Sequence, residues 1–237
     1  MIPPALHRRL ARWRRRACEA VGSSRYSRPA LDELDRKLER HLDRDGGYFV
    51  EAGANDGFTQ SNTYYFERCR GWRGVLVEGI PALAAECRRN RPAAVVVEAA
   101  LVSAAAPGQT VTMHYSGLMS AVENALGSTE ATAEHIQRGL AVQSLAATYA
   151  VAVPARTLTE VLAENCPGQE IDLLSLDVEG MEADVLRGLD FARFAPRFLC
   201  VETRNRGELE PLLAVRYRVV ETLVDHGTRS DLLWQRL

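Results

Sequence analysis

Carboxylates recur along this chain at the ends of short apolar runs, and they are the residues best suited to chemistry. An ionised carboxylate accepts hydrogen bonds from hydroxyls, attracts cations, ligates hard divalent ions and can take a proton as a general base. Apolar runs that alternate with helical segments predict a mostly parallel sheet, in which ligands bind at the carboxyl ends of the strands. Acids at five such ends therefore predict a polar crevice along one edge of the sheet: Glu51, Glu78, Glu98, Asp177 and Glu202.

The first of these acids begins the stretch Glu51–Gly57 (E-A-G-A-N-D-G), a glycine turn after the apolar run Tyr48–Ala52. The dinucleotide fingerprint G-x-G-x-x-G would bring a pyrophosphate to a helix N-terminus. This turn lacks the middle glycine and carries two acids, which would repel a phosphate. S-adenosylmethionine fits better, because it has an ammonium, a sulfonium and a ribose diol but no phosphate. The turn therefore predicts S-adenosylmethionine as the cofactor.

The acids near this turn have expected roles toward that cofactor. Glu51 and Asp56 would attract its cationic end, and Gly53 would let the backbone approach it. Glu78, at the end of the second run, would accept hydrogen bonds from both ribose hydroxyls, and the third run would reach the adenine at its end, Glu98. Taken singly, each acid has a structural alternative as a helix cap, an arginine partner or a solvated strand end.

A second acidic group consists of Asp177, Glu179 and Glu202, expected at the ends of neighbouring strands. One interpretation is that a carboxylate of raised pKa, Asp177 or Glu179, acts as a general base. A second is that all three ligate Mg²⁺, which would lower the pKa of an acceptor hydroxyl. A third is purely structural, with Glu179 and Glu182 stabilising the N-terminus of the following helix.

Short apolar or β-branched runs predict the strands that must position these acids: Tyr48–Ala52, Gly74–Glu78, Ala94–Glu98, Ile171–Leu176 and Phe198–Val201. An edge strand is expected at Val111–Tyr115, and a closing antiparallel hairpin at Tyr217–Val224 and Leu232–Leu237. Helix signals, including a capping box at Thr157–Glu160, predict helices at Ser61–Arg70, Pro81–Asn90, from Thr157 onward and at Glu182–Leu189. Residues 116–150 break the alternation, and their composition predicts a helical insert that acts as a lid over the acceptor.

Several of these segments together resemble the FkbM-type S-adenosylmethionine-dependent methyltransferases. The matching pieces are F-V-E-A-G-A-N-D-G (49–57), S-N-T-Y-Y-F-E (61–67), W-R-G-V-L-V-E-G (72–79), V-V-E-A-A-L (96–101), V-P-A-R-T-L (153–158) and D-L-L-S-L-D-V-E-G-M-E-A-D-V-L-R-G (172–188). The resemblance implies an α/β, Rossmann-like class I methyltransferase fold with a seven-stranded sheet, and O-methylation of natural-product or glycan hydroxyls. Gly79 and Ser175 depart from the family pattern, in which a proline and a lysine often stand at these positions.

The strand ends and the resemblance together predict the cofactor-binding residues Glu51, Gly53, Asn55, Asp56, Gly57, Asn62, Glu78, Gly79, Glu98, Ala99 and Asp177. The predicted function is an S-adenosylmethionine-dependent O-methyltransferase acting on a hydroxyl of a small molecule, natural product or glycan. The alternative is a protein that binds S-adenosylmethionine or S-adenosylhomocysteine without catalysis. The second acidic group favours chemistry, because binding alone does not need it.

Length and composition fit one α/β domain, with 237 residues, 46% hydrophobic and 25% charged. We expect the methyltransferase domain at residues 45–237 and a basic, helical N-terminal extension at residues 1–44. No apolar run approaches the ~20 residues of a membrane span. The five cysteines form no C-x-x-C pair, which predicts free thiols in a reducing compartment and a cytoplasmic location.

Charge is unevenly distributed along the chain. Residues 1–25 hold seven arginines and one glutamate, a net +6, which leaves −8 on residues 26–237 of a chain whose total is −2. The acidic body argues against nucleic acid as a partner. The basic start predicts a solvated helix or, as the alternative, peripheral contact with an anionic membrane. The sequence leaves the oligomeric state open, including a homo-oligomer.

Overall fold

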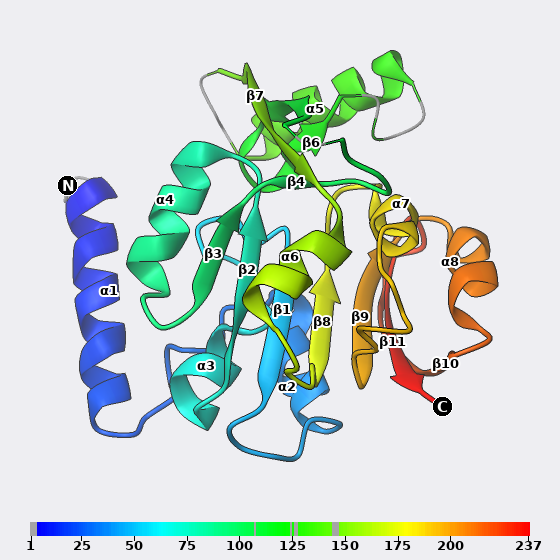
Figure 1. The fold of residues 1–237 in the computed structure, drawn as a ribbon. Coiled ribbons are helices and arrows are strands. Elements are labelled where there is room, and N and C mark those ends of the chain that lie inside the picture. Colours follow the sequence, from blue (N-terminus) through cyan, green and yellow to red (C-terminus); the bar gives the residue numbers. More distant parts are fainter. Residues whose placement is uncertain (1–3, 107, 124, 126–127, 144–146) are drawn as a thin grey trace.

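The main sheet of the protein is seven-stranded and mostly parallel. A computed structural model of the chain describes residues 4–106, 108–123, 125, 128–143 and 147–237, and the sheet order is β10-β11-β9-β8-β1-β2-β3 (Figure 1). The strand bounds are β1 Tyr48–Ala52, β2 Arg73–Glu78, β3 Val95–Glu98, β8 Leu173–Leu176, β9 Phe198–Thr203, β10 Tyr217–Asp225 and β11 Ser230–Arg236. Only β11 runs antiparallel to its neighbours β9 and β10 among the strands of this sheet. The expected class I methyltransferase fold with a C-terminal antiparallel hairpin is confirmed.

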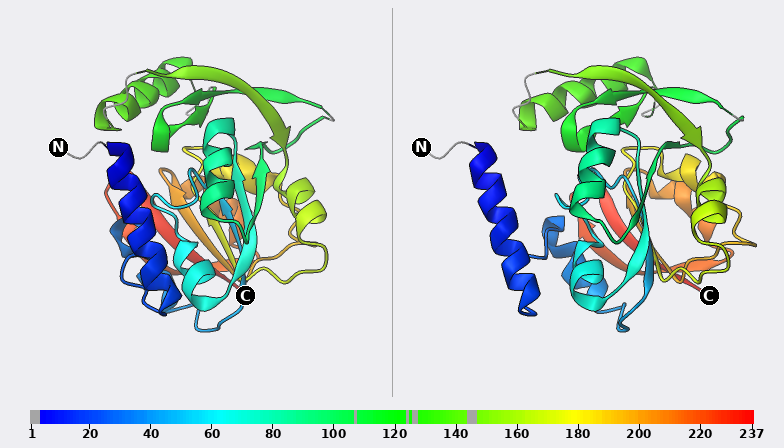
Figure 2. Two further views of the ribbon diagram at one scale, coloured as in Figure 1. Left: turned by 90° about the vertical axis from the view of Figure 1, so that its left-hand side faces the viewer. Right: turned by 60° about the vertical axis from the view of Figure 1, so that its left-hand side comes forward.

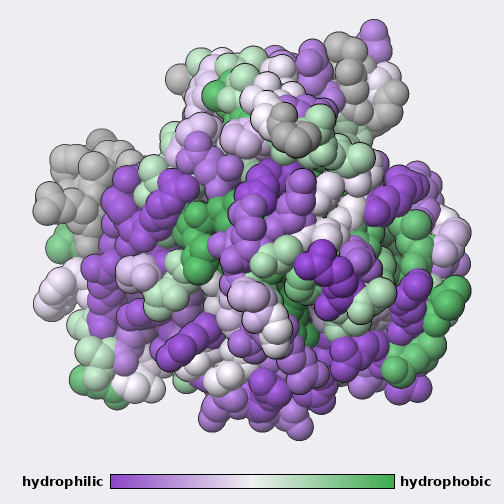
Figure 3. Space-filling model, viewed as in Figure 1, coloured by the Kyte–Doolittle hydropathy of each residue, from purple (hydrophilic) through white to green (hydrophobic). Residues whose placement is uncertain are grey.

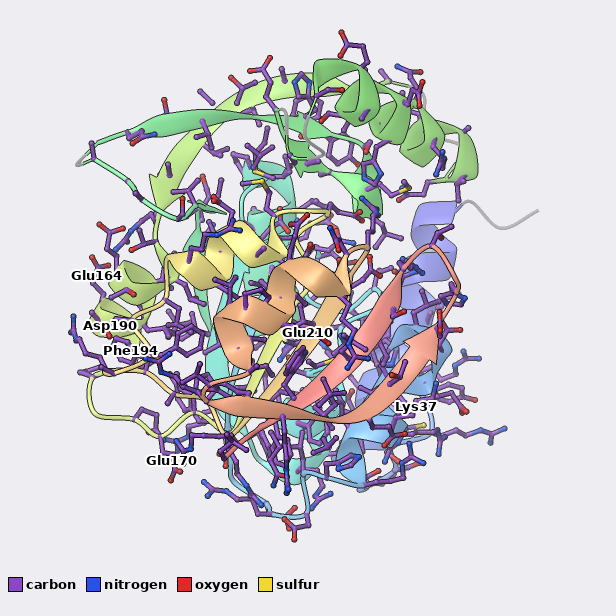
Figure 4. The ribbon with its side chains drawn as sticks, turned by 90° about the vertical axis from the view of Figure 1, so that its right-hand side faces the viewer. Lys37, Glu164, Glu170, Asp190, Phe194 and Glu210 are labelled. Atoms are coloured by element: carbon purple, nitrogen blue, oxygen red, sulfur yellow. The ribbon has the colours of Figure 1, made fainter. Side chains whose placement is uncertain are left out.

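Helices cover both faces of this sheet (Figures 1 and 2). Their bounds are α2 Leu34–Glu39, α3 Tyr64–Arg70, α4 Pro81–Asn90, α6 Leu158–Asn165, α7 Glu182–Arg187 and α8 Arg206–Leu213. On one face α2, α3 and α4 pack with Phe49, and on the other α6, α7 and α8 pack with Val50. Both side chains are fully buried, because a central strand of a parallel sheet has a core on each face. Lys37 Nζ donates to Leu223 O at 2.8 Å and links α2 to β10 (Figure 4).

Local signals account for two of the helix starts and not for a third. Pro81 occupies the first turn of α4, and the capping box of α6 forms as predicted, with Thr157 Oγ1 accepting from Glu160 N at 3.2 Å. α3 begins at Tyr64, three residues after the predicted Ser61. Ser61 Oγ does accept from Tyr64 N at 3.1 Å, but it also donates to Glu51 Oε2 at 2.8 Å. The second bond holds Ser61 against β1, and the helix therefore begins after this residue.

A second, smaller sheet forms a lobe above the carboxyl ends of the main strands (Figures 1 and 3). The strand order of this sheet is β4-β7-β5-β6. The strand bounds are β4 Ala100–Leu101, β5 Thr110–Tyr115, β6 Ala121–Val122 and β7 Tyr149–Arg156. The lobe also contains the 3-10 helix Gly117–Met119 and α5 Thr129–Gln143. The predicted strand Val111–Tyr115 therefore exists, but it pairs with β7 and not with an edge of the main sheet.

The insert, residues 116–150, contains the predicted helix but also strand residues that were not expected. α5 and the 3-10 helix are helical, whereas β6 and the first residues of β7 are extended. The alanine-rich sequence of β6 and β7 gives a weak alternation signal, because alanine has a low strand propensity. Residues 124, 126–127 and 144–146 of the insert lie outside the described residues.

α1, Pro4–Ala20, lies at the outer edge of the molecule, apart from the sheet (Figures 1 and 2), and its Glu19 contacts Tyr64 and Arg68 of α3. The 3-10 helix Leu31–Glu33 follows it and leads into α2. Among the helices of the described residues, none combines the length and apolarity needed to cross a bilayer.

Candidate active site

A cavity of about 350 Å³ lies at the carboxyl ends of β1, β2 and β8. The strand order switches at β1, which has β2 and β3 on one side and β8 and β9 on the other. Ligands of open α/β sheets bind at such a switch point. Residues 117–122 and 142–143 of the insert contribute to the opposite wall. Most residues of the predicted cofactor set line this cavity: Glu51, Gly53, Asn55, Asn62, Glu78, Gly79, Ala99 and Asp177.

Gly53 ends β1 with a φ of +82°, a conformation that side chains disfavour. A Cβ built on Gly53 would lie 1.8 Å from Asp177 O. The sequence assigned this glycine to close approach by a ligand. The structure gives a different reason, because the atom that excludes a side chain belongs to the backbone after β8.

Glu78 is buried at the end of β2, facing the cavity. Its Oε2 accepts from Asn55 N at 2.8 Å, and its Oε1 accepts from Ile80 N at 2.7 Å. Burial raises the pKa of Glu78 to about 7, against the opposing effect of these backbone N–H groups. Each oxygen makes one of these bonds, so each retains capacity to accept from a ligand hydroxyl.

Glu51 also lines the cavity, but its carboxylate is largely engaged by the protein. Oε2 accepts from Ser61 Oγ at 2.8 Å and from Thr63 Oγ1 at 2.6 Å, and Oε1 accepts from Asn62 N at 2.8 Å. Arg91 Nη1 lies 3.7 Å from Glu51 Oε2. Glu51 therefore holds the segment 61–63 against the end of β1.

Arg91 completes this network from the end of α4. Its side chain is fully buried, and it donates to Glu67 Oε2 at 2.7 Å, Gly57 O at 3.1 Å and Thr63 Oγ1 at 3.0 Å. Sequence reasoning missed Arg91, because no motif separates a buried arginine from the exposed arginines that precede it in α4.

Asp177 follows β8 and reaches the cavity. Although Asp177 is exposed to solvent at the cavity, desolvation by the surrounding protein and the nearby carboxylates of Glu202 and Glu179 raise its pKa above the usual range. A carboxyl group in this setting is a better general base at neutral pH than an ordinary aspartate.

The other two acids of this group are paired with arginines. Glu179 Oε2 lies 2.9 Å from Arg204 Nη2, and Glu202 Oε2 lies 2.8 Å from Arg229 Nη1. Burial raises the pKa of Glu202 to about 7, although Arg229 opposes that shift. Glu179 lines the cavity with Arg229, whereas Glu202 does not.

These pairs remove the argument for a bound metal. One of the three interpretations of the sequence placed Mg²⁺ here to offset the repulsion among Asp177, Glu179 and Glu202. In the structure Arg204 pairs with Glu179 and Arg229 pairs with Glu202, which supplies positive charge without a metal. Across the described part of the chain, no group of three or more His, Cys, Asp or Glu side chains is placed to hold a metal ion. The predicted Mg²⁺ site is therefore not supported.

Three residues predicted to bind the cofactor do not line the cavity. Asp56 Oδ1 accepts from Phe58 N at 2.8 Å and from Thr59 N at 2.6 Å, so its carboxylate closes its own turn. Glu98 Oε2 instead lies 3.3 Å from Arg88 Nη1 at the surface.

Gly57, the third of them, has a φ of +75°, and a Cβ there would lie 2.8 Å from Cys87 Sγ. It serves the packing of the turn against α4. Sequence position alone could not distinguish these roles, because Asp56 and Glu98 are each adjacent to a residue that lines the cavity, and Gly57 is two residues from Asn55 and from Thr59.

Asn62 and Ser175 meet across the cavity wall. Asn62 Nδ2 donates to Ser175 Oγ at 3.0 Å, at the position where the resembling family often has lysine. Asn62 Oδ1 is buried and has no hydrogen-bond partner within the described structure. It is therefore an acceptor that a bound ligand could satisfy. Sequence reasoning also missed apolar lining residues from the second sheet and its connections, among them Leu101, Met113 and Val122.

The sheet order, with a cavity at its switch point, is that of the class I methyltransferase fold. Residues 51–221 match the Methyltransferase FkbM domain, and the chain belongs to this family. The protein is thus an S-adenosylmethionine-dependent methyltransferase. No curated protein sequence matches the chain.

Solved structures with a similar fold include three methyltransferases. A TehB-like SAM-dependent methyltransferase from Corynebacterium glutamicum is 12% identical, with 99% of this chain and 100% of that chain covered and a TM-score of 0.44. The human methyltransferase 10 domain containing protein is 10% identical, with 86% and 81% covered and a TM-score of 0.48. Precorrin-6y C5,15-methyltransferase from Geobacter metallireducens is 11% identical, with 87% and 88% covered and a TM-score of 0.47. At these sequence identities and TM-scores, the solved structures add nothing to the functional assignment that the family match provides.

Proposed function

We propose that the protein transfers the methyl group of S-adenosylmethionine to a hydroxyl of a small molecule, natural product or glycan. The observation that carries this proposal is the place of Asp177, which follows β8 and lines the cavity beside Glu179. An alcohol is a poor nucleophile at neutral pH, so its methylation benefits from a nearby base that takes the hydroxyl proton.

The cavity residues fit the cofactor. A volume of about 350 Å³ lies within the range of small-molecule sites. We propose that Glu78 binds the ribose diol through the remaining lone pairs of its two oxygens, and that Asn62 Oδ1 accepts from the amino group of the methionine end. The adenine would lie among apolar side chains beyond Ala99, which include Leu101, Met113 and Val122. Gly53 and Asn55 would contribute backbone groups, and Glu51 would act indirectly by holding Asn62.

The chemistry requires one proton transfer by the protein. When bound, the cofactor supplies a methyl group on a positively charged sulfur. Asp177 would accept the proton of the acceptor hydroxyl and so make that oxygen a better nucleophile for the methyl group, with S-adenosylhomocysteine as the other product. Glu179 orients the site from its ion pair with Arg204, and is a positioning residue in this scheme.

The test is release of S-adenosylhomocysteine with a panel of hydroxylated acceptors, comparing the wild type with Asp177→Asn. We expect the variant to lose about 10²–10⁴-fold in turnover. Its affinity for S-adenosylhomocysteine, measured by calorimetry, should remain, which separates loss of the base from loss of the cofactor site. Wild-type turnover in Asp177→Asn would show that Asp177 is not the base, and no product with any acceptor would favour binding without catalysis.

Turnover in EDTA tests the metal interpretation separately. We expect full activity in the chelator, because the acids near Asp177 are already paired with Arg204 and Arg229. Activity that is lost in EDTA and restored by Mg²⁺ would contradict this expectation.

The proposal extends to partners and location. The net −8 of residues 26–237 supports a small-molecule or glycan acceptor over nucleic acid. The free cysteines support a reducing compartment such as the cytoplasm, since three of them, Cys87, Cys166 and Cys200, are buried as thiols.

A further inference from the structure

Helix α1 presents an apolar stripe to solvent. Leu10 is 51% exposed, Trp13 is 72% exposed and Val21, just after the helix, is 81% exposed, and Ala17 between them is exposed as well. At 3.6 residues per turn the three helical positions, Leu10, Trp13 and Ala17, fall within about 60° of the circumference. Large apolar side chains seldom line up on a solvent-facing helix without a partner.

The opposite side of α1 is fixed to the body. Arg15 is buried, and its guanidinium lies 3.5 Å from the ring centroid of Phe58. Glu19 accepts from Ser27 Oγ at 2.7 Å and from Tyr64 OH at 2.9 Å. The helix is therefore seated on the protein in one rotational orientation, and the apolar stripe faces outward because of it.

Exposed arginines flank the stripe. Arg14 lies on one side of it and Arg16 on the other, and Arg25 is exposed beyond the end of the helix. Residues 1–25 carry a net +6 against −8 for the remainder. The segment with a net excess of positive charge is thus the one that carries the exposed Trp13, since Trp72 and Trp234 are each 2% exposed.

We propose that α1 binds the protein peripherally to an anionic lipid surface. An interfacial helix places an apolar face at the headgroup–acyl boundary and its arginines among the anionic headgroups. Tryptophan prefers this boundary, because its ring is apolar and its N–H can remain hydrated. The stripe is short, so apolar burial alone gives weak binding, and the arginines must supply much of the affinity.

The same arrangement is a poor fit to the other polyanions. A nucleic-acid surface would engage the arginines but leave Leu10, Trp13 and Val21 in water. The acidic body would also be repelled along an extended polyanion, whereas a helix at the outer edge of the molecule can touch a membrane with the body held away (Figure 2).

The experiment is sedimentation of the full-length protein with vesicles. Phosphatidylcholine vesicles containing about one-third phosphatidylserine should pellet the protein, and pure phosphatidylcholine vesicles should not. Binding should weaken as NaCl is raised from about 0.1 to about 0.5 M. Tryptophan emission should shift to the blue on binding, and the shift reports Trp13 because Trp72 and Trp234 are already buried.

Paired variants separate the helix from general charge. The double variant Arg14→Glu with Arg16→Glu should lower the partition coefficient between vesicles and water by at least about 25-fold, because each arginine contributes about fivefold. Arg187→Glu with Arg206→Glu makes the same change in net charge on α7 and α8, at exposed sites on the opposite side of the molecule, and should bind as the wild type does (Figure 1). Trp13→Ala should lose the blue shift and bind more weakly. Thermal melting checks that each variant is folded.

Three results would overturn the proposal. One is equal binding to anionic and neutral vesicles, and another is unchanged binding of the α1 double variant. The third is binding of RNA or a purified protein through α1 without any vesicle binding, which would assign the stripe to another class of partner.

Discussion

The two oxygens of Glu78 each accept a backbone N–H and face the cavity. Glutamine in its place keeps the shape but loses one acceptor and the charge. We expect Glu78→Gln to weaken S-adenosylhomocysteine binding by about 1.5–3 kcal/mol, the range for hydrogen bonds to charged groups. Calorimetry measures this. Glu98→Gln, at a strand end outside the cavity, is the matched control and should bind as the wild type does; equal affinity of both variants would remove Glu78 from the site.

The pKa of Glu78 gives a second expectation, for stability against pH. Burial raises that pKa from 4.5 to about 7, so the folded protein holds the proton more tightly than the unfolded chain. The resulting stability is complete below about pH 4.5 and is lost as the pH rises through about 7. Glu78→Gln cannot ionise, and should therefore gain stability relative to the wild type across that range. Urea denaturation at a series of pH values measures the difference, and a constant difference contradicts the raised pKa.

Gly53 and Gly79 both line the cavity but should respond differently to alanine. A Cβ at Gly53 would lie 1.8 Å from the backbone oxygen of Asp177, and the φ of +82° adds strain. A Cβ at Gly79 would meet the flexible end of Met113, with Sδ at 2.2 Å. We expect Gly53→Ala to lower the melting temperature strongly and Gly79→Ala to stay folded with weaker cofactor binding. If Gly53→Ala is folded and as stable as the wild type, the backbone near Asp177 O must be able to move away from the added Cβ, which would contradict this expectation.

At the scale of elements, the segment between β1 and α3 depends on Arg91 at the end of α4. Replacing Arg91 with leucine leaves the buried carboxylate of Glu67 without its ion-pair partner and removes the positive charge near Glu51, which keeps its hydrogen bonds to residues 61–63. We expect a loss of about 3–5 kcal/mol in the free energy of unfolding, the cost of breaking a buried ion pair. Arg88→Leu removes an exposed pair with Glu98 in the same helix, and should cost no more than about 1 kcal/mol. Denaturant titration of both variants tests the contrast; similar losses would argue against a special role for Arg91.

At the scale of the whole molecule, the insert at residues 116–150 contributes to one wall of the cavity, and we still predict that it acts as a lid. Gln143 joins α5 to the 3-10 helix, donating to Ser116 O and accepting from Leu118 N, each at 2.8 Å. His135 Nε2 of α5 lies 3.2 Å from Glu179 Oε2 on the opposite wall. Within the described residues α5 is held by these bonds and by a small apolar cluster of Ile136 with Ala121, and not by the main sheet, so its amides should exchange faster than those of β1.

Hydrogen exchange tests this prediction directly. Saturating S-adenosylhomocysteine with acceptor should slow exchange at residues 129–143. Helix α6, which packs on one face of the main sheet and does not line the cavity, is the control and should be unaffected. Slow exchange of α5 in the free protein, unchanged by ligands, would indicate a fixed helical layer instead.

Much of the fold could be predicted from the sequence because its signals are local. The apolar run of β1, the proline of α4 and the capping box of α6 each act within a few residues, and all three elements begin where expected. The second sheet could not be predicted, because β5 and β7 pair across more than thirty intervening residues and β4 and β6 are two residues long. Their stability comes from partners that the local pattern does not contain.

The sequence by itself determined that acids stand at or near the strand ends; Glu51, Glu78 and Asp177 line the cavity, whereas Glu98 and Glu202 do not. Parallel strands bring their carboxyl ends to one edge whatever the details of packing. Only the tertiary structure decided what each acid does there. Asp56 accepts hydrogen bonds within its own loop, and Glu51 interacts with Arg91 and the 61–63 segment. Arg204 and Arg229 pair with Glu179 and Glu202, two of the acids that suggested a metal. A sequence shows the charge of a side chain, but its partner is fixed by direction and distance in the folded chain.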